Sequence, residues 1–556
     1  MPLNGDDVPR ETICHPVIGH IRGIKRYTDL VQFLGVQYAT LKDRFARGEL
    51  CQNYPSAAGH VLDADHFGPL PMSPVDGCEH EQRLIQRSLP FSPFHQSDTQ
   101  CLTLNISAPS GHGPGSLPVL VFVHGGAFAT GSSSYPQCDL APITNMSVEA
   151  GTPMISVGIN YRVGAPGFLY SSTMKDAGYR TNNGLDDQRL ALRWINHHIA
   201  GFGGDPARVT FLGESAGAAS GFFHLHHPEP LFHQFVAMSG SSQQRLRRVE
   251  QADTAYTSVL EALDAMELPP KQQIDVLLET PINDFLAKVG RRFPIGPLID
   301  GDSIPVGTTF RSLRDKDEVV KLFPGLRHCK RVIIGDCQMD GMAFSSRVSG
   351  RTDILPRTME RCMSAVFDSI SPNIAQDLGS RYGLDIFAEA NTPETLEPVL
   401  RFGNDVMFSL PAREFARAWS ESNVPDTEAF LCHFNAPNPW DGPWKGHATH
   451  IQDIAFVLQN YRDTLSVGQR RCGERYANDL IAFVNGAKPW PAYQSDVEPG
   501  SMVYDAPSDG DEDESRFVLE EAPALTGRRD LLQKVVGEEL FDKLVDVWQM
   551  FMLGGP

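Results

Sequence analysis

Residues 119–128 read Val-Leu-Val-Phe-Val-His-Gly-Gly-Ala-Phe, and this stretch decides the fold. Its first five residues are all apolar, as in a strand that is buried on both faces. The apolar run stops abruptly at His124, where two glycines follow and predict a turn. Another apolar strand, residues 154–159, precedes a segment with helical spacing, residues 186–199. Strands that alternate with helices predict an α/β fold with a mainly parallel sheet covered on both faces.

A second motif lies further along the chain, where residues 213–217 read Gly-Glu-Ser-Ala-Gly. The motif follows a short apolar strand, residues 209–211, and leads into an alanine-rich run that suits a helix. In a strand-turn-helix of this kind the serine has a strained backbone, and the flanking glycines leave room for it and for an approaching substrate. Ser215 is therefore a candidate nucleophile.

Acyl transfer through a serine also needs hydrogen-bond donors aimed at the oxyanion of the tetrahedral intermediate. The loss of one such donor typically costs about 100- to 1,000-fold in rate. The backbone N–H groups of Gly125, Gly126 and Ala216 are the candidate donors of this oxyanion hole. The two motifs are separated by enough chain for complete α/β units, so together they favour a catalytic site.

The chain resembles the type-B carboxylesterases, a family that includes lipases and cholinesterases. Besides the two motifs above, the resemblance is carried by Asn-Tyr-Arg at 160–162, residues 183–188, Phe-Gly-Gly-Asp-Pro at 202–206, Met-Ser-Gly-Ser at 238–241, residues 296–301 and Trp-Pro-Ala-Tyr at 490–493. It implies the α/β-hydrolase fold, with a central mostly parallel twisted sheet, flanking helices and helical insertions around a substrate gorge. Residues 35–45 depart from the usual family pattern and are similar to a subgroup of fungal intracellular esterases.

The resemblance also implies the domain organisation, with a single catalytic domain over residues 1–556. Helical insertions are expected at about 250–290 and 356–425. The composition of residues 494–515 shifts to Pro, Gly and Asp and predicts an acidic loop. Residues 531–552 are expected to close the chain as an amphipathic helix.

Two predictions concern the first hundred residues. The apolar runs at 16–18 and 30–36 predict strands of an antiparallel edge. Residues 51–100 are rich in Pro, His and Gly, which predicts a long surface loop at the entrance to the site.

The nucleophile needs a base, and the base needs a carboxylate that holds its tautomer. In the α/β-hydrolase fold these residues follow the serine in the order acid, then histidine. The apolar strand at 331–335 is followed by Asp336 and Asp340. The family usually has Glu immediately before a glycine here, and that position is filled by Asp340. Asp336 remains the alternative acid.

Two histidines, His447 and His450, follow the next apolar strand. In the family an acidic residue stands three positions after the catalytic histidine and precedes an apolar run. Asp453 gives this register to His450, whereas the position of the preceding glycine keeps His447 as an alternative. The resemblance also implies that Glu214 and Ser239 are buried supporting residues beside the site.

The composition of the chain limits the kinds of partner and the cellular compartment that are expected. The chain has 48 Lys and Arg against 68 Asp and Glu, a formal charge of −20, which makes nucleic acid and anionic membranes poor partners. The sequence shows neither an apolar run of about 18 residues nor a signal-peptide pattern at its start, and it predicts a cytoplasmic protein. In that compartment the ten cysteines are expected to be free thiols; Cys78 and Cys101 would be the pair in an oxidising one.

The spacing of His224, His226 and His227 fits no common zinc site, so no metal and no other cofactor is expected. The predicted function is hydrolysis of a small-molecule carboxylic ester by a Ser215–His450–Asp340 triad through an acyl-enzyme. One alternative is a transacylase, or a lactone-forming or lactone-hydrolysing enzyme, of specialised metabolism with the same triad. Another is a catalytically silent cholinesterase-like binding module, although such modules have generally lost a triad residue. The sequence does not define the oligomeric state.

Overall fold

The computed structural model describes residues 8–54, 56, 59–293, 295–386, 388–494, 499–519, 532 and 535–556. Several predictions fall partly outside these residues, among them the loop over 51–100 at positions 55, 57 and 58 and the insertion over 356–425 at position 387. The others are the predictions for the start of the chain, for positions 495–498 of the acidic loop, and for positions 531, 533 and 534 of the C-terminal helix.

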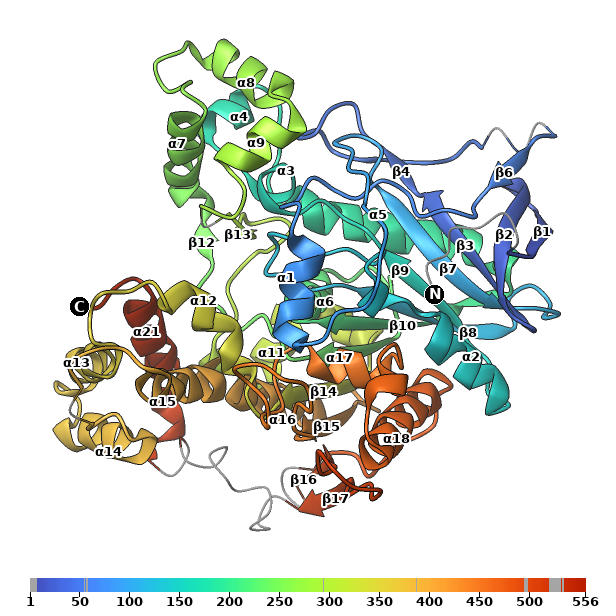
Figure 1. Ribbon diagram of the computed structural model, residues 1–556. Helices are drawn as coiled ribbons and strands as arrows, with labels where there is room; N and C mark the ends of the chain where they lie inside the picture. Colours follow the sequence, from blue (N-terminus) through green and yellow to red (C-terminus); the bar gives the residue numbers. More distant parts are fainter. Residues whose placement is uncertain are drawn as a thin grey trace.

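A single large sheet runs through the molecule (Figure 1). Within the described residues its strand order is β1-β2-β3-β7-β9-β8-β10-β11-β14-β15-β16-β17, and β6 pairs with β2. The strands from β9 to β16 are parallel, and antiparallel pairs lie at the two ends. The predicted central, mostly parallel sheet is confirmed. The strands are β1 (Arg10–His15), β2 (Gly19–Tyr27), β3 (Leu30–Gln37), β6 (Val61–Asp63), β7 (Thr103–Pro109), β8 (Leu117–Val123), β9 (Ile155–Ile159), β10 (Gly204–Glu214), β11 (Gln234–Met238), β14 (Arg331–Cys337), β15 (Glu428–Phe434), β16 (Gly500–Tyr504) and β17 (Arg516–Leu519).

Both faces of the sheet are covered by helices. Because successive side chains of a strand point to opposite faces, β8 contributes Val119 and Val121 to one core and Leu120 and Phe122 to another. The first core contains residues of α5 (Asn183–His198), α6 (Ala216–Leu225) and α16 (Leu410–Ser420). The second contains residues of α2 (Ala141–Glu149), α17 (Gln452–Val457) and α18 (Val467–Val484).

The parallel register brings the carboxyl ends of the central strands to one edge. Val123 at the end of β8 is paired with Gly213 of β10, and Glu214 is paired with Met238 at the end of β11. Met238 is in turn paired with Gly335 of β14. The turns that follow β8, β10 and β14 therefore lie beside one another, although they are far apart in sequence.

Two groups of helices lie beyond the sheet (Figure 1). Helices α7 (Asp253–Ala262), α8 (Pro270–Glu279) and α9 (Ile282–Lys288) stand together at the top of the view. Helices α13 (Leu355–Phe367), α14 (Pro372–Tyr382), α15 (Pro393–Asn404) and α21 (Phe541–Met552) form the group at lower left. Between α15 and α16 the chain forms one π-helical turn, η7 (Asp405–Ser409).

Several local predictions were wrong. The loop expected over 51–100 contains α1 (Gly77–Ile85), whose buried residues Cys78, Glu81, Gln82 and Ile85 have helical spacing within a Pro-rich segment. The loop expected over 494–515 contains β16, a short apolar strand that extends the sheet. The expected C-terminal helix, by contrast, is present as α21, which follows a 3₁₀ turn, and Leu532 and Val535 are helical as well.

The first of the two expected edge strands, residues 16–18, is instead the turn between β1 and β2. Val17 and Ile18 donate their N–H groups to Nδ1 of His15 at 3.1 and 3.0 Å. The side chain of His15 thus accepts two backbone hydrogen bonds from the turn and stabilises it.

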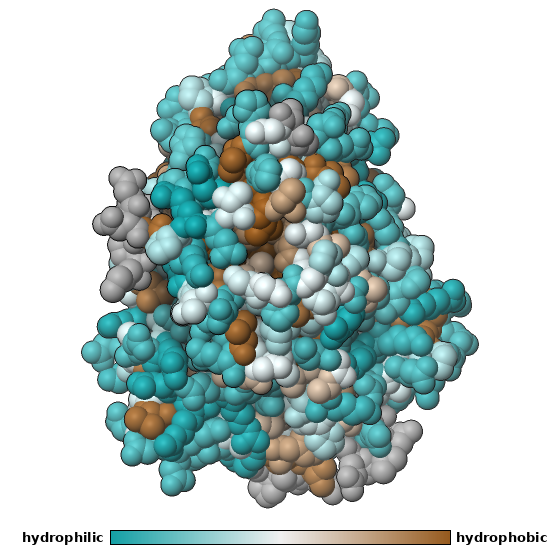
Figure 2. Space-filling model, turned by 90° about the vertical axis from the view of Figure 1, so that its right-hand side faces the viewer, coloured by the Kyte–Doolittle hydropathy of each residue, from teal (hydrophilic) through white to brown (hydrophobic). Residues whose placement is uncertain are grey.

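The hydropathy of the surface and of the helices is that of a fold whose apolar residues are mostly buried. On the face shown in Figure 2, hydrophilic residues cover most of the surface and hydrophobic residues gather in the upper middle. Within the described residues, no helix combines the length and the hydrophobicity that a membrane crossing requires.

A buried ion pair ties the loop after β9 to α5. Arg162 donates through Nε and Nη2 to both carboxylate oxygens of Asp187, each at 2.7 Å, and both side chains are almost completely buried. A further N–H of Arg162 donates to the carbonyl oxygen of Arg44 at 3.1 Å, in the segment that follows β4 (Ala39–Thr40). The fork geometry satisfies both oxygens of a carboxylate that no water reaches.

Arg162→Met should therefore lower the free energy of unfolding by about 3–5 kcal/mol, because Asp187 would be left buried without a counter-charge. The midpoint of urea unfolding measures the loss. Arg22→Met is the matched control, since Arg22 pairs with Asp63 on the surface and such pairs contribute about 1 kcal/mol or less. Equal midpoint shifts for the two variants would contradict the assignment.

Candidate active site

Ser215 occupies the sharp turn between β10 and α6. Its backbone has φ 55° and ψ −118°, a conformation that a non-glycine residue adopts only under strain. Its N–H donates to the carbonyl oxygen of Met238 at 2.8 Å, at the end of the neighbouring strand. The side chain is partly exposed, so the turn presents the hydroxyl group to the space above the sheet edge.

The glycines around the serine are required by close backbone packing. A Cβ added at Gly213 would collide with the carbonyl oxygen of Gly217, and one added at Gly217 would collide with that of Val123. A Cβ at Gly240 would collide with the carbonyl oxygen of Ser215 itself. The glycines of the Gly-x-Ser-x-Gly pattern are therefore required because the backbones of β8, β10 and α6 approach one another so closely.

The structure brings Ser215, His450 and Asp340 together. Nε2 of His450 lies 3.0 Å from Oγ of Ser215, and Nδ1 lies 2.7 Å from Oδ1 of Asp340. The other oxygen of Asp340 accepts the N–H of Cys337 at 2.7 Å. Met339 donates its N–H to the carbonyl oxygen of Ala448 at 2.8 Å, which holds the turn after β14 against the turn that carries His450.

The two alternative residues have other neighbours. Asp336 forms an ion pair with Nδ1 of His433 on the adjacent strand β15. The ring of His447 packs edge-on against Trp444, with ring centroids 6.0 Å apart. Thus His450 and Asp340, rather than His447 and Asp336, are the residues next to Ser215.

The turn after β8 lies directly against the serine. A Cβ added at Gly125 would lie 2.8 Å from Cβ of Ser215, and it would collide with the carboxylate of Glu214. Gly126 has φ 93°, and Ala127 and Phe128 also have positive φ. A Cβ added at Gly126 would collide with the carbonyl oxygen of Thr130, so this left-handed position requires a glycine.

The three candidate donors have free N–H groups. Within the described part of the chain, the N–H groups of Gly125, Gly126 and Ala216 donate to no protein acceptor. Ala216 is the first residue of α6, where a helix leaves its N–H groups without internal partners. All three are therefore able to donate to a bound oxyanion.

Buried carboxyl groups surround His450. Oε1 of Glu214 lies 3.3 Å from Nε2 of His450. Burial lowers the pKa of His450, but the charge of Glu214 and the contacts with Asp340 outweigh burial and raise this pKa to about 9. Burial raises the pKa of Glu214 well above its usual range. A proton on Glu214 removes its attraction for the imidazolium, so the pKa of His450 depends on the charge of Glu214.

Ser239 and Asp453 complete this polar region. Ser239, with φ 51°, directs its hydroxyl group to Oδ2 of Asp453 at 3.4 Å. Burial, followed by the charge of Asp340, raises the pKa of Asp453 to about 7. In the sequence Asp453 served only to set the register of His450, whereas the structure places it in the buried polar region itself.

Two neighbours of the site were missed in the sequence. Glu81 of α1 is buried, and burial raises its pKa to about 7. Its helical spacing was hidden within a segment rich in Pro and Gly. Phe408 lies in the π-helical turn with its ring centroid 5.3 Å from that of His450. A π turn shifts the helical period by one residue, so periodicity alone could not identify this contact.

Four aromatic residues, Phe128, Phe344, Trp440 and Trp444, are divided between the core and the site. Phe128 is buried edge-on against Phe168. Trp440 packs against Tyr461 in the core and Trp444 against His447. Only Phe344 is tied to the neighbourhood of His450, because it packs against Phe408 with ring centroids 5.7 Å apart.

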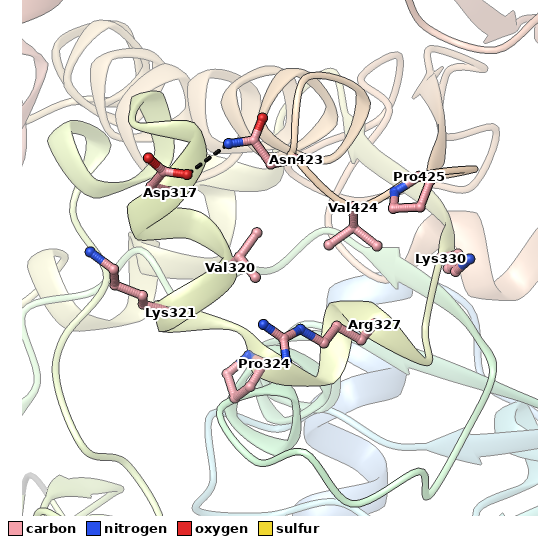
Figure 3. A pocket seen from close by; sticks show the side chains of 9 residues that line it. All are labelled: Asp317, Val320, Lys321, Pro324, Arg327, Lys330, Asn423, Val424 and Pro425. Carbon is pink, nitrogen blue, oxygen red and sulfur yellow. Dashed lines mark hydrogen bonds between the residues drawn. The ribbon is translucent and has the colours of Figure 1, made fainter.

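A separate surface pocket, shown in Figure 3, lies at the other end of the sheet. It has a volume of about 760 Å³ and includes Lys330, which immediately precedes β14. Asp340 follows the opposite end of the same strand, roughly 20 Å away for seven residues. Two of the pocket's cations are paired with the protein's own acids, Lys321 with Glu318 and Lys330 with Asp426. This pocket is not part of the Ser215 site.

The three neighbouring histidines point to different protein groups. His224 lies 2.8 Å from Oε1 of Gln188, and Nδ1 of His226 lies 2.7 Å from the carbonyl oxygen of Leu322. His227 lies 3.3 Å from the carbonyl oxygen of Ser303. No group of three or more metal-ligating side chains occurs among the residues that the structure describes.

Comparison with known proteins adds to this geometry. A sequence model described as "Carboxylesterase family" matches residues 10–494. The chain is 30% identical over 462 residues to Lipase 4 of Diutina rugosa, with 76% of each chain covered. It is 35% identical over 478 residues to the para-nitrobenzyl esterase of Bacillus subtilis (strain 168), with 81% of this chain and 86% of the relative covered. A solved structure of PNB esterase covers 94% of this chain and 99% of its own at a TM-score of 0.69 and 23% identity, and it supports the fold.

Gly217→Ala should destabilise the protein by about 2 kcal/mol or more, because the new methyl group overlaps a backbone carbonyl that cannot rotate away. Gly113→Ala is the control. Gly113 has open space around it and no positive φ, so its substitution should change the thermal midpoint little. If Gly217→Ala unfolds at the wild-type temperature, the close packing of the turn is not a constraint.

Proposed function

The chain belongs to the carboxylesterase family of type-B esterases and lipases and is a carboxylic-ester hydrolase, and from that premise we propose that it acts through a Ser215–His450–Asp340 triad. The observation that carries the proposal is the pair of contacts at His450, 3.0 Å to Ser215 and 2.7 Å to Asp340. The three residues come from widely separated parts of the chain, which supports treating the chain as a single catalytic domain.

In the first step Nε2 of His450 accepts the proton of the Ser215 hydroxyl group while Oγ attacks the ester carbonyl carbon. The carbonyl π electrons move to oxygen and form a tetrahedral oxyanion. Asp340 holds Nδ1–H of His450, so that Nε2 is the free base, and stabilises the imidazolium that forms. The imidazolium then gives its proton to the leaving alkoxide, and an acyl-enzyme remains on Ser215.

The oxyanion is bound in this scheme by the N–H groups of Gly125, Gly126 and Ala216. Within the described residues these N–H groups have no protein acceptor, and Gly125 lies against the serine; both observations support this role. Such donors are effective because the fold fixes them before charge develops.

In the second step His450 takes a proton from water, and the resulting hydroxide attacks the acyl carbonyl. Collapse of the second tetrahedral intermediate releases the carboxylic acid and returns the proton to Ser215. Glu214, Ser239 and Asp453 form no bond to the substrate in this scheme. The charges of Glu214 and Asp453 favour the imidazolium that forms at His450, and Ser239 directs its hydroxyl group to Asp453.

The same triad would serve a transacylase or a lactone-forming enzyme, in which an alcohol or an amine replaces water as the acyl acceptor. Product identity with an alcohol added distinguishes these reactions. A silent binding module would require the triad geometry to have no use, and the aligned contacts argue against it. Relatives named lipase and para-nitrobenzyl esterase make acyl and aryl esters suitable first probes.

Ser215→Ala should reduce hydrolysis of p-nitrophenyl acetate and p-nitrophenyl octanoate by at least about 1,000-fold, because no other group at the site forms the acyl-enzyme. Release of p-nitrophenol at matched folded concentration measures the loss. Ser156→Ala removes a completely buried hydroxyl group on β9 that is bonded to Thr144, and it should keep wild-type turnover. Undiminished turnover by Ser215→Ala would exclude the proposed nucleophile.

The pH dependence of kcat/KM tests whether the charge of Glu214 raises the pKa of His450. The imidazole accepts a proton only when neutral, so kcat/KM should rise with pH towards its pKa of about 9. Glu214→Gln removes the largest cause that raises this pKa, and the acidic limb of the profile should therefore move to lower pH. An acidic limb that stays in place or moves to higher pH would show that Glu214 does not act on His450.

A further inference from the structure

Asp336, the alternative acid, belongs to a continuous chain of hydrogen bonds around the turn that carries Asp340. The N–H of Gly341 donates to Oδ1 of Asn404 at 3.0 Å, and Nδ2 of Asn404 lies within hydrogen-bond distance of Oγ of Ser409, at 3.3 Å. The hydroxyl group of Ser409 donates to Oδ2 of Asp336. Oδ1 of the same carboxylate is paired with His433.

All four side chains of this network are at most 5% exposed. The network is defined as Asn404, Ser409, Asp336 and His433. Buried polar groups destabilise a fold unless they are hydrogen-bonded, and a partly satisfied network is worse than an apolar core. Each of the four has a partner in this chain, so the network is a completed feature rather than a defect.

The network forms hydrogen bonds on both sides of Asp340, at Asp336 and at Gly341. Asp336 lies four residues before Asp340, and Gly341 comes immediately after it. Gly341 is held so closely to α15 that an added Cβ would collide with the carbonyl oxygen of Leu400 and lie 3.0 Å from Asn404. The carboxylate of Asp340 has little freedom to move away from His450 while both ends are held.

The π-helical turn η7 makes the network possible. In an α-helix, the residue that stacks beneath Asn404 would be the one four positions later, Phe408. The wider turn, with i to i+5 bonding, instead places Ser409 beside Asn404. Phe408 is thereby freed to contact the ring of His450. One irregular turn thus directs a hydroxyl group to Asp336 and an aromatic ring to His450.

We propose that Asn404, Ser409, Asp336 and His433 are positioning residues, which hold the carboxylate of Asp340 at Nδ1 of His450 and fix Phe408 against the imidazole ring. This inference rests on the triad proposed above and extends it. None of the four touches a reacting atom, so the network acts through the placement of Asp340 and Phe408.

The test uses Ser409→Ala and Asn404→Ala, two variants that break the network without changing any charge. The charged or titratable groups that face His450 remain in place; they are Asp340, Glu214, Asp453 and Glu81. Steady-state kcat and KM for p-nitrophenyl acetate and the pH profile of kcat/KM are measured below the unfolding temperature, at matched folded concentration. Ser147→Ala is the control, because it removes an equally buried, hydrogen-bonded hydroxyl group from α2.

We expect each network variant to lower kcat by about tenfold with a change in KM below about twofold. We also expect the acidic limb to move to lower pH, because a loosened Asp340 no longer raises the pKa of His450. Ser147→Ala should change neither quantity. A purely structural role would lower the unfolding temperature of all three variants and leave the pH profile unchanged.

The outcomes separate the two proposals. Wild-type kcat and an unchanged acidic limb in both network variants, with activity lost in Ser215→Ala, would overturn the positioning network and leave the triad standing. Retained turnover in Ser215→Ala would overturn the triad and the positioning role together. A tenfold loss of kcat with a shifted limb in Ser409→Ala alone would keep Ser409, Asp336 and His433 in the network and remove Asn404.

Discussion

The strained backbone of Ser215 is the constraint on which the rest of the structure depends. A residue with φ 55° and ψ −118° persists only where its surroundings leave no alternative. Those surroundings are the ends of three parallel strands and the first turn of α6. Their backbones approach so closely that Gly213, Gly217 and Gly240 have no room for a Cβ. The register of the sheet therefore does more than build a core, because it also fixes the position of the hydroxyl group.

At the same edge of the sheet, several buried carboxyl groups lie around the side chain of His450. Glu214, Asp340, Asp453 and Glu81 are all buried near His450, and burial raises the pKa of each. A buried imidazolium would be costly alone, and these carboxyl groups make it favourable, so His450 has a raised pKa despite its burial. This arrangement favours the charged state that the proposed mechanism requires of the histidine while it carries the proton.

The fold could be predicted from sequence where a local pattern and a tertiary constraint coincide. The apolar run before His124 and the glycines around Ser215 are such cases, because each glycine in the motif corresponds to a backbone contact in the structure. Asp453 set the register of His450, the histidine that the structure places next to Ser215. Glu81 and Phe408 were not predictable in this way. Glu81 lies on a short helix within a Pro-rich segment, and Phe408 reaches His450 only because a π turn breaks the helical period.

The short side chain of Asp340 explains why the surroundings of the proposed triad are so restrictive. The family usually has Glu at this position, and Asp is one methylene group shorter. The carboxylate reaches His450 only if the backbone of its turn comes closer, and the structure holds that turn from three directions. Cys337 donates to the carboxylate, Met339 donates to the turn before His450, and Gly341 donates to Asn404. A longer Glu side chain could adjust its own torsions to keep the contact, whereas Asp340 depends on the backbone. The shorter acid and the buried network beside it are thus two parts of one structural solution.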